Sequence, residues 1–179
     1  MRGTRWLLCA ALACAAPAQA LGPADADVLY LPTPPAVVEA MLDLAGLRPD
    51  DLLVDLGAGD GRIPIAAARR GARAIGVELD ARKVAEAKRN VEAAGVSARV
   101  EIRQGDARHA DLGGTTVVTL FLLPELNRAL RPKLQGLAPG TRIVSHRFGI
   151  GDWAPDRKVN AHGHPLFLWV VPARRAGGG

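Results

Sequence analysis

The sequence predicts an α/β fold, in which a mostly parallel sheet carries helices on both faces. Short apolar runs alternate with stretches of helical periodicity along the 179-residue chain, a pattern typical of strand–helix–strand units with right-handed crossovers. The first apolar run ends in a glycine-rich turn, at the edge where such sheets bind their ligands. Towards the C-terminus, two apolar stretches flank residues 161–164, which indicates an antiparallel hairpin at the edge of the sheet.

Seven strands are expected, each a short apolar or β-branched run bounded by turn residues. They are residues 52–56, 74–78, 100–103, 115–122 and 142–145, with 158–160 and 165–171 forming the hairpin. The fold class is therefore α/β, with a mostly parallel seven-stranded sheet and a C-terminal antiparallel hairpin.

Helices are expected between the strands, where apolar residues recur with helical spacing. One is an alanine-rich stretch closed by Gly71, and residues 81–94 form the next behind the capping residue Asp80. Residues 124–137 form the last helix, although Pro132 lies inside it and should kink or divide it.

Residues 1–20 have the pattern of a secretory signal peptide. Arg2 and Arg5 precede an apolar run that reaches Ala16, and residues 18–20 supply a small-residue cleavage site. We therefore expect the protein to be exported to the periplasm or the cell envelope. The apolar run is too short to span a bilayer comfortably, so an N-terminal membrane anchor is the second interpretation. A mitochondrial transit peptide is the third, because the leader contains no acidic residue.

The remaining residues, 21–173, are enough for one domain with its own core, and residues 174–179 are expected to be a disordered tail. Both cysteines, Cys9 and Cys14, lie in the leader, so the mature chain offers no disulfide and no thiolate. Removing the leader lowers the basic count from 23 to 21 against 18 acidic residues, and the net charge from +5 to +3. Aromatic residues are only 4% of the chain, so no nucleic-acid partner is expected.

The glycine-rich turn follows the first strand and reads VDLGAGDGR over residues 54–62. Its glycines are Gly57, Gly59 and Gly61. In the dinucleotide-binding fingerprint the third glycine comes one position later, where this chain has Arg62. The spacing therefore departs from that of a pyrophosphate cradle.

The acidic residues in this turn are stronger evidence against a bound pyrophosphate than the glycine spacing is. Asp55 and Asp60 would repel a pyrophosphate, because like charges about 4 Å apart repel by about 4 kcal/mol at an effective dielectric of about 20. They would instead attract a ligand that carries a cationic amine and a sulfonium. That description fits S-adenosylmethionine, which we prefer to a dinucleotide as the ligand of this turn.

Two further acids lie at the ends of the next two predicted strands. Glu78 stands 21 residues after Gly57, where an acid takes a ribose diol through two hydrogen bonds. Asp106, after the third strand, is placed to accept a hydrogen bond from an adenine amino group. The predicted donor contacts also include Ala58 in the turn and the residues that follow the two acids, Leu79 and Ala107.

In order along the chain, DLGAGDGRI, GVELD and QGDA resemble the class I S-adenosylmethionine-dependent methyltransferases, over residues 29–171. Residues 30–34, 117–127 and 145–153 resemble, more narrowly, bacterial relatives of the mitochondrial lysine methyltransferases that modify the ATP synthase c subunit and the adenine nucleotide translocase. The resemblance implies a Rossmann-like methyltransferase fold, S-adenosylmethionine as donor, and N-methylation of a protein lysine, with a membrane protein as one candidate acceptor. Those enzymes carry an asparagine-proline-tryptophan element where this chain has residues 80–82, Asp-Ala-Arg, so their substrates do not transfer directly.

Methyl transfer is a direct displacement, so the protein must mainly align the reactants and exclude water. Tyr30 and Thr33 offer hydroxyls in a proline-rich segment that we expect to close over the site; the alternative is a simple lead into a helix at Val37. Glu125, after the fourth strand, is placed to orient the acceptor, or is a first-turn acid favoured by the helix dipole. His146 could take a proton, although a histidine at a strand end is more often packed there.

No metal site is predicted, because His109, His162 and His164 lack the spacing of metal ligands. Trp153 and Trp169 either line an acceptor channel or fill the edge of the core, and the core is the preferred interpretation for Trp169.

The alternatives to a protein-lysine methyltransferase are a small-molecule methyltransferase and a noncatalytic module that binds the donor. A nucleic-acid methyltransferase is disfavoured, because LPEL stands where an asparagine-proline-proline-aromatic element would follow the fourth strand.

Overall fold

The computed structural model describes residues 31–173. The predicted leader, residues 1–20, the candidate Tyr30 and the predicted tail, residues 174–179, lie outside the described residues. None of the helices within residues 31–173 is both long enough and apolar enough to cross a membrane.

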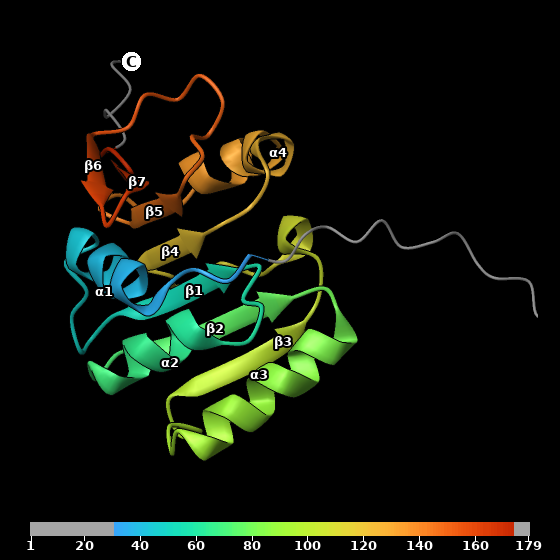
Figure 1. Cartoon of the computed structure of the whole chain (residues 1–179). Coiled ribbons are helices and arrows are strands. Elements are labelled where there is room, and N and C mark those ends of the chain that lie inside the picture. The colour runs from blue at the N-terminus through green and yellow to red at the C-terminus, as the bar shows by residue number, and fades with distance from the viewer. Residues whose placement is uncertain (1–30, 174–179) are drawn as a thin grey trace, which may run out of the picture. The chain divides into compact units, whose positions relative to one another are not determined.

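One sheet of seven strands, in the order β3-β2-β1-β4-β5-β7-β6, forms the centre of the fold (Figure 1). The strands are β1 (Leu52–Leu56), β2 (Arg73–Glu78), β3 (Val100–Gln104), β4 (Val117–Leu120), β5 (Arg142–His146), β6 (Arg157–Ala161) and β7 (His164–Val170). Neighbours among β1 to β5 pair in parallel, whereas β7 runs antiparallel to both β5 and β6. The predicted mostly parallel sheet with its C-terminal antiparallel hairpin is confirmed.

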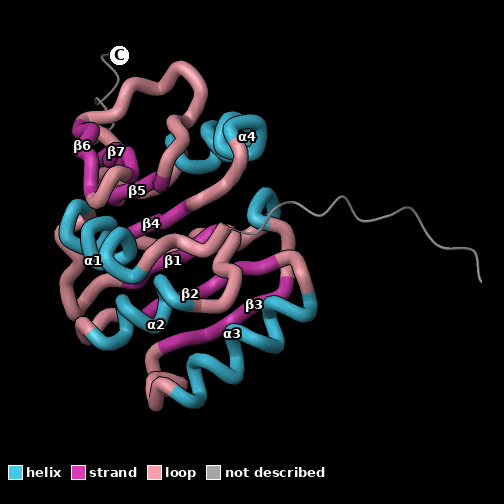
Figure 2. The backbone as a smooth tube through the Cα atoms, in the orientation of Figure 1, coloured by secondary structure: helices cyan, strands magenta, loops and turns pink. Residues whose placement is uncertain are grey.

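Helices cover both faces of the sheet (Figure 2). They are α1 (Pro35–Leu44), α2 (Arg62–Arg69), α3 (Ala81–Ala93), α4 (Pro124–Gln135) and the short 3-10 helix η1 (Ala107–His109). Alternate residues of each strand point to opposite faces. Leu53 of β1 therefore packs in the core beneath α1 to α3, whereas Val54 packs in the core that α4 covers.

Two elements differ from the sequence prediction. β4 spans only residues 117–120 rather than 115–122, because the last residue of β1, Leu56, pairs with Leu120 and leaves the residues after it without a partner in β1. α4 runs on to Gln135 and is not divided by Pro132. Pro132 lies in the last turn of the helix. Its missing N–H therefore removes only one backbone hydrogen bond, close to the C-terminal end of the helix.

Trp169 belongs to the core, as preferred from the sequence, and the half-buried Trp153 packs against it. Trp169 is fully buried, and its ring lies 5.8 Å from that of Trp153, centroid to centroid. The indole N–H of Trp169 donates a 3.0 Å hydrogen bond to the carbonyl of Trp153. The pair packs in the core on the α4 face of the sheet.

Candidate active site

The glycine turn connects β1 to α2 at the carboxyl edge of the sheet, and its backbone requires residues without a side chain. Gly57, Gly59 and Gly61 have φ angles of +82°, +55° and +82°, a region that other residues rarely adopt. A Cβ on Gly57 would lie 2.6 Å from Cδ2 of Leu122, in the segment after β4. The backbone N–H groups of Gly57 and Ala58 donate to the carbonyl of Val77 at 2.9 and 3.0 Å, which fixes the turn against β2.

Asp55 lies within β1, one residue before the strand ends, and is 2% exposed. Its Oδ1 accepts a 2.7 Å hydrogen bond from the hydroxyl of Thr119, its partner in the β1–β4 register. Its Oδ2 is buried and has no hydrogen-bond partner in the structure. Burial raises the pKa of Asp55 to about 7; the bond from Thr119 opposes this shift, and the carboxylates of Glu78 and Asp60 add to it. A buried acceptor of this kind calls for a donor or a cation from a ligand.

Glu78 ends β2 and places its carboxylate beside the glycine turn. Oε2 accepts a 2.9 Å hydrogen bond from the N–H of Gly59, and Oε1 accepts one of 2.9 Å from the N–H of Asp80. The carboxylate thus connects the turn after β1 with the turn after β2. The next residue, Leu79, is 67% exposed, an unusual position for a large apolar side chain.

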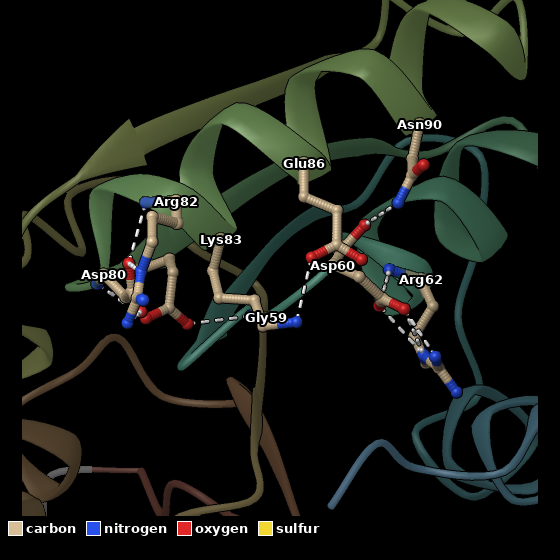
Figure 3. Close-up of polar contacts among 9 residues, drawn as sticks. Gly59, Asp60, Arg62, Asp80, Arg82, Lys83, Glu86 and Asn90 are labelled. Atoms are coloured by element: carbon tan, nitrogen blue, oxygen red, sulfur yellow. Dashed lines mark hydrogen bonds and ion pairs between the residues drawn. The ribbon is translucent and has the colours of Figure 1, made fainter. Parts of the chain in front are cut away.

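Asp60 differs from Asp55, because the protein itself neutralises its charge. The guanidinium of Arg62 pairs with the Asp60 carboxylate (Figure 3), and Nη1 of Arg62 donates 2.7 Å to the carbonyl of Thr33. Burial alone would raise the pKa of Asp60, but the hydrogen bonds and charge of Arg62, with the charge of Lys83, lower it below its usual value. Of the two acids in this turn, Asp55 is therefore the one whose carboxylate is left to attract a cationic ligand.

Helix α3 supports the turn from its other side. Nδ2 of Asn90 donates a 2.9 Å hydrogen bond to the carbonyl of Asp60, and Lys83 forms a 2.9 Å ion pair with Glu86 in the same helix (Figure 3). A Cβ on Gly61 would lie 3.2 Å from the Cβ of Ala87, so α3 and the turn approach closely. The bond from Asn90 and the close approach of Ala87 hold the turn against α3.

Asp106 follows β3 and is the N-cap of η1. Its carboxylate accepts a 2.8 Å hydrogen bond from the backbone N–H of Arg108 and also pairs with the guanidinium of that residue. These interactions lower the pKa of Asp106 to about 2, so it is ionised at neutral pH. The neighbouring Ala107 is 8% exposed and packs into the core.

A second group of polar residues converges at the ends of β4 and β5. Thr33 is 4% exposed, and its hydroxyl lies 3.1 Å from Nδ1 of His146, the last residue of β5. Nε2 of His146 lies 2.8 Å from Nδ1 of His164 at the start of β7. The ring of Phe121 lies 4.1 Å from that of His146, centroid to centroid. Thr33 and His146 are 113 positions apart in the sequence, so no local pattern links them.

The loop after β5 lies in the stretch 145–153 that carries the family resemblance, but its residues were not predicted as part of the site. Arg147 has a φ of +67°, in the left-handed region, and the following Phe148 carries a ring 6.3 Å from that of Phe121. The hydroxyl of Ser145 donates 2.6 Å to the carbonyl of Phe148, and Nδ2 of Asn127 donates 3.1 Å to the carbonyl of Gly149. The loop is therefore fixed by buried polar side chains.

The other acceptor-side candidate, Glu125, is an exposed residue in the first turn of α4. Within residues 31–173, no three His, Cys, Asp or Glu side chains gather as a metal site requires.

Comparison with known proteins relates these features to a family. A sequence model of the ANTKMT methyltransferase domain matches residues 55–157. A protein-lysine N-methyltransferase of Saccharolobus islandicus (strain REY15A) is 42% identical over 151 residues, which are 80% of this chain and 94% of that protein. The adenine nucleotide translocase lysine N-methyltransferase of Mus musculus is 38% identical over 74% of this chain, which spans 58% of that protein.

Among solved structures, an RNA methyltransferase from Salinibacter ruber in complex with S-adenosyl-L-homocysteine is 49% identical. It superposes with a TM-score of 0.78, and the match covers 83% of this chain and 98% of that one. All three relatives are described as methyltransferases, the solved one with S-adenosyl-L-homocysteine bound, and their descriptions differ in the acceptor.

S-adenosylmethionine fits the residues at this edge of the sheet. The turn at Gly57 has no room for a side chain, because a Cβ there would lie 2.6 Å from Leu122, and the buried Oδ2 of Asp55, two residues earlier, has no partner among the described residues. The carboxylate of Glu78, at the end of β2, can accept hydrogen bonds from a ribose diol. The family match covers more than half of the chain, from residue 55 to residue 157, and the chain therefore belongs to the ANTKMT methyltransferase domain family and is an S-adenosylmethionine-dependent methyltransferase.

Proposed function

We propose that this enzyme N-methylates the side chain of a lysine in a protein. The observation that carries the proposal is the 42% identity to the archaeal protein-lysine N-methyltransferase, since the match spans nearly all of that relative. Two features of the described residues support a protein rather than a nucleic acid as the acceptor.

The first feature is the character of the exposed side chains at the carboxyl edge of the sheet. Leu31 before α1 and Leu123 after β4 are 50% and 52% exposed. Exposed apolar groups of this size, gathered at one edge, are typical of a surface that contacts another protein or a ligand.

The second feature is the placement of the aromatic rings. Every Phe and Trp within residues 31–173 is buried or half-buried, so this part of the chain presents no fully exposed ring on which a base could stack. The rings of Phe121 and Phe148 lie instead side by side at the ends of β4 and β5, 6.3 Å apart. Half-buried aromatic rings suit the apolar stem of a lysine side chain.

The bound donor supplies an electrophilic methyl group on a sulfonium. We assign to Asp55 the stabilisation of the cationic part of the donor, to Glu78 the ribose diol, and to Asp106, with Ala107, the adenine. Gly57, Gly59 and Gly61 with Ala58 would form the floor of the donor site, and the exposed Leu79 would be covered by the donor. Asp60 has a structural role in this scheme, because it is already paired with Arg62.

On the acceptor side, Thr33 lies near the aromatic pair through its contact with His146, and Glu125 lies at the edge of the site. A free lysine has a pKa of about 10.4, so less than about 0.1% of it is neutral at pH 7. The amine must lose a proton before it can attack, and a half-buried site favours the neutral form. We assign Thr33 as the first acceptor of that proton and Glu125 as a group that orients the incoming lysine.

The acceptor can be identified directly. The full-length chain is incubated with methyl-labelled S-adenosylmethionine and a fractionated cell lysate, and aliquots are digested with ribonuclease or with protease. We expect a labelled band that ribonuclease leaves intact and protease removes, with the label on lysine by mass spectrometry. Asp55→Ala should abolish the label, whereas Glu101→Gln, a change at an exposed acid of β3, should retain it.

The same experiment tests the other acceptors. The Salinibacter relative is described as an RNA methyltransferase, and label in a ribonuclease-sensitive fraction would exclude the lysine proposal in favour of RNA. Label in small molecules alone would exclude both. Donor binding without transfer to any fraction would indicate a noncatalytic module.

We further propose that residues 1–20 direct the chain to the periplasm or envelope, with a membrane protein as its acceptor. Fractionation of cells that express the tagged full-length chain tests this location. Recovery of an uncleaved chain in the cytoplasm would contradict it.

A further inference from the structure

We propose that Thr33, His146 and His164 form a proton pathway that carries the proton of the acceptor ammonium away from the site. The inference rests on the proposed lysine acceptor and adds the route by which the amine becomes neutral. The three side chains are called the proton pathway below.

The geometry of the proton pathway is continuous. The Thr33 hydroxyl lies 3.1 Å from Nδ1 of His146, and Nε2 of His146 lies 2.8 Å from Nδ1 of His164. His146 is 1% exposed and uses both of its ring nitrogens, one on each side. His164 is half-buried at the start of the edge hairpin, closer to solvent. An imidazole bonded at both nitrogens can take a proton at one and release a proton from the other.

The charged groups around His146 favour its neutral form. Burial lowers the pKa of His146 to about 4, and the charges of His164 and Arg147 act in the same direction. Arg62 donates to the Thr33 carbonyl, but its charge is balanced by its ion pair with Asp60. The hydrogen bonds of these three side chains within residues 31–173 involve no carboxylate. A neutral imidazole has one donor and one acceptor nitrogen, so the pathway has a direction.

The proton pathway begins next to the donor site. Leu120 pairs with Leu56 on one side and with Ser145 on the other, so Gly57, Phe121 and His146 follow at the same level of the sheet. The ring of Phe121 contacts that of His146. The next residue, Leu122, packs against the glycine turn.

The proton transfer balances without any redox partner. An N–H bond of the acceptor ammonium breaks, and its proton goes to the Thr33 oxygen while the hydroxyl proton of Thr33 goes to Nδ1 of His146. The proton on Nε2 of His146 passes to Nδ1 of His164, and the proton on Nε2 of His164 leaves to water. The electron pair left on the amine nitrogen then forms the new N–C bond as the C–S bond of the donor breaks. One proton is released, and exchange of the histidine tautomers restores the starting state.

Replacement of the outermost residue tests the pathway with least damage to the core. His164→Phe keeps a ring but removes the nitrogen that accepts from His146. At saturating donor and pH 7, we expect single-turnover methyl transfer by the full-length chain to fall about 100-fold. The deficit should shrink as the pH rises towards about 10, because the lysine then loses its proton to bulk water. Donor affinity and thermal midpoint should stay at wild-type values.

His162→Asn is the matched control, since His162 lies in the same hairpin, is exposed, and has a φ of +53° that asparagine tolerates. It should follow the wild-type pH profile. His164→Ala gives a second test that does not depend on the fit of a phenylalanine: added imidazole should restore its transfer rate at pH 7. An unchanged rate, or a deficit of the same size at every pH with no rescue, would overturn the proton pathway.

A measurement independent of turnover separates this inference from the proposed function. In ¹⁵N spectra of the histidine side chains, His146 should stay neutral at pH 6 and become protonated only around pH 4. Thr33→Val should shift the tautomer populations of both His146 and His164, because the bonds are coupled. If the wild-type chain labels no protein, the lysine proposal fails whatever these spectra show. If His164 is insensitive to Thr33→Val, the proton pathway fails whatever the acceptor is.

Discussion

Asp55 accepts a 2.7 Å hydrogen bond from Thr119, its register partner on β4, and leaves its second carboxyl oxygen buried without a partner. The arrangement raises the pKa of Asp55 to about 7, chiefly through burial. In the free enzyme, the ionised form of Asp55 is therefore poorly stabilised by the protein near neutral pH. A cationic ligand beside it would stabilise that form more than the folded protein does. This is the property expected of a donor-binding residue rather than of a structural one.

The first prediction concerns the pH dependence of folding stability. The pKa of Asp55 is higher in the folded chain than in the unfolded one, so its contribution to stability is present in acid and is lost as the pH rises towards 7. Asp55→Asn removes this loss. The stability difference between variant and wild type should therefore increase by up to about 1.4 kcal/mol per pH unit between about pH 4 and pH 7. Urea unfolding of both proteins across this range measures it.

Asp51→Asn provides a control of opposite sign. Asp51 is buried and pairs with Arg142. Burial alone would raise the pKa of Asp51, but its hydrogen bonds from Thr116, Arg48 and Arg142 lower it. Its stabilisation is therefore present at neutral pH and lost in acid. Parallel pH profiles for the two variants would contradict both assignments.

The second prediction concerns the glycine turn. Gly57→Ala places a Cβ 2.6 Å from Leu122 at a φ of +82°. We expect a loss of about 2 to 3 kcal/mol in unfolding free energy, from backbone strain together with overpacking. Donor affinity measured by calorimetry should fall at least about 10-fold, since the added carbon also narrows the donor site.

Gly95→Ala serves as the comparison, because Gly95 has a φ of +69° but open space around its missing Cβ. It should lose only about 1 kcal/mol, the strain alone, and bind the donor as the wild type does. Equal effects of the two substitutions on donor binding would show that Gly57 does not border the donor.

The third prediction tests the acid at the end of β2. Glu78→Gln retains one oxygen acceptor but loses the charge that accepts from two backbone N–H groups. We expect the donor to bind about 10-fold more weakly, measured by calorimetry. The control is Glu101→Gln, at an exposed acid in the adjacent strand that pairs with Arg103. An equal loss in both variants would point to net charge rather than to contact with the ribose.

The fourth prediction concerns the link between the glycine turn and the segment before α1. Arg62 pairs with Asp60 and donates to the carbonyl of Thr33. Arg62→Ala should therefore speed amide exchange around Thr33 and weaken donor binding, because the two segments are no longer held together.

Arg82→Ala is its counterpart, since Arg82 also pairs with the aspartate two residues before it, but with 87% of its side chain exposed. Such an exposed pair is screened by solvent and contributes little to stability, so exchange and donor binding should remain at wild-type values. If Arg62→Ala behaves like Arg82→Ala, the link has no functional role.

Local sequence patterns predicted most of the framework of this protein. Apolar runs bounded by glycines placed β1, β2 and β5 to within a residue or so, since such signals depend on near neighbours in the chain. The hairpin at residues 161–164 and the glycine turn after Leu56 followed from turn chemistry alone. The carboxylates of Asp55 and Asp60 together predicted a cationic donor.

Other features depended on which segments the folded chain brings together. The length of β4 is set by where β1 ends, and Asp60 is neutralised because Arg62 folds back onto it. The contact between Thr33 and His146 joins residues 113 positions apart, through the packing of α1 against the edge of the sheet. Periodicity and propensity describe only a residue's sequence neighbours, whereas hydrogen-bond partners and burial depend on the whole path of the chain. The sequence therefore determined the elements and the sign of the donor's charge, and the tertiary structure decided which acid remains unpaired and which side chains can move a proton.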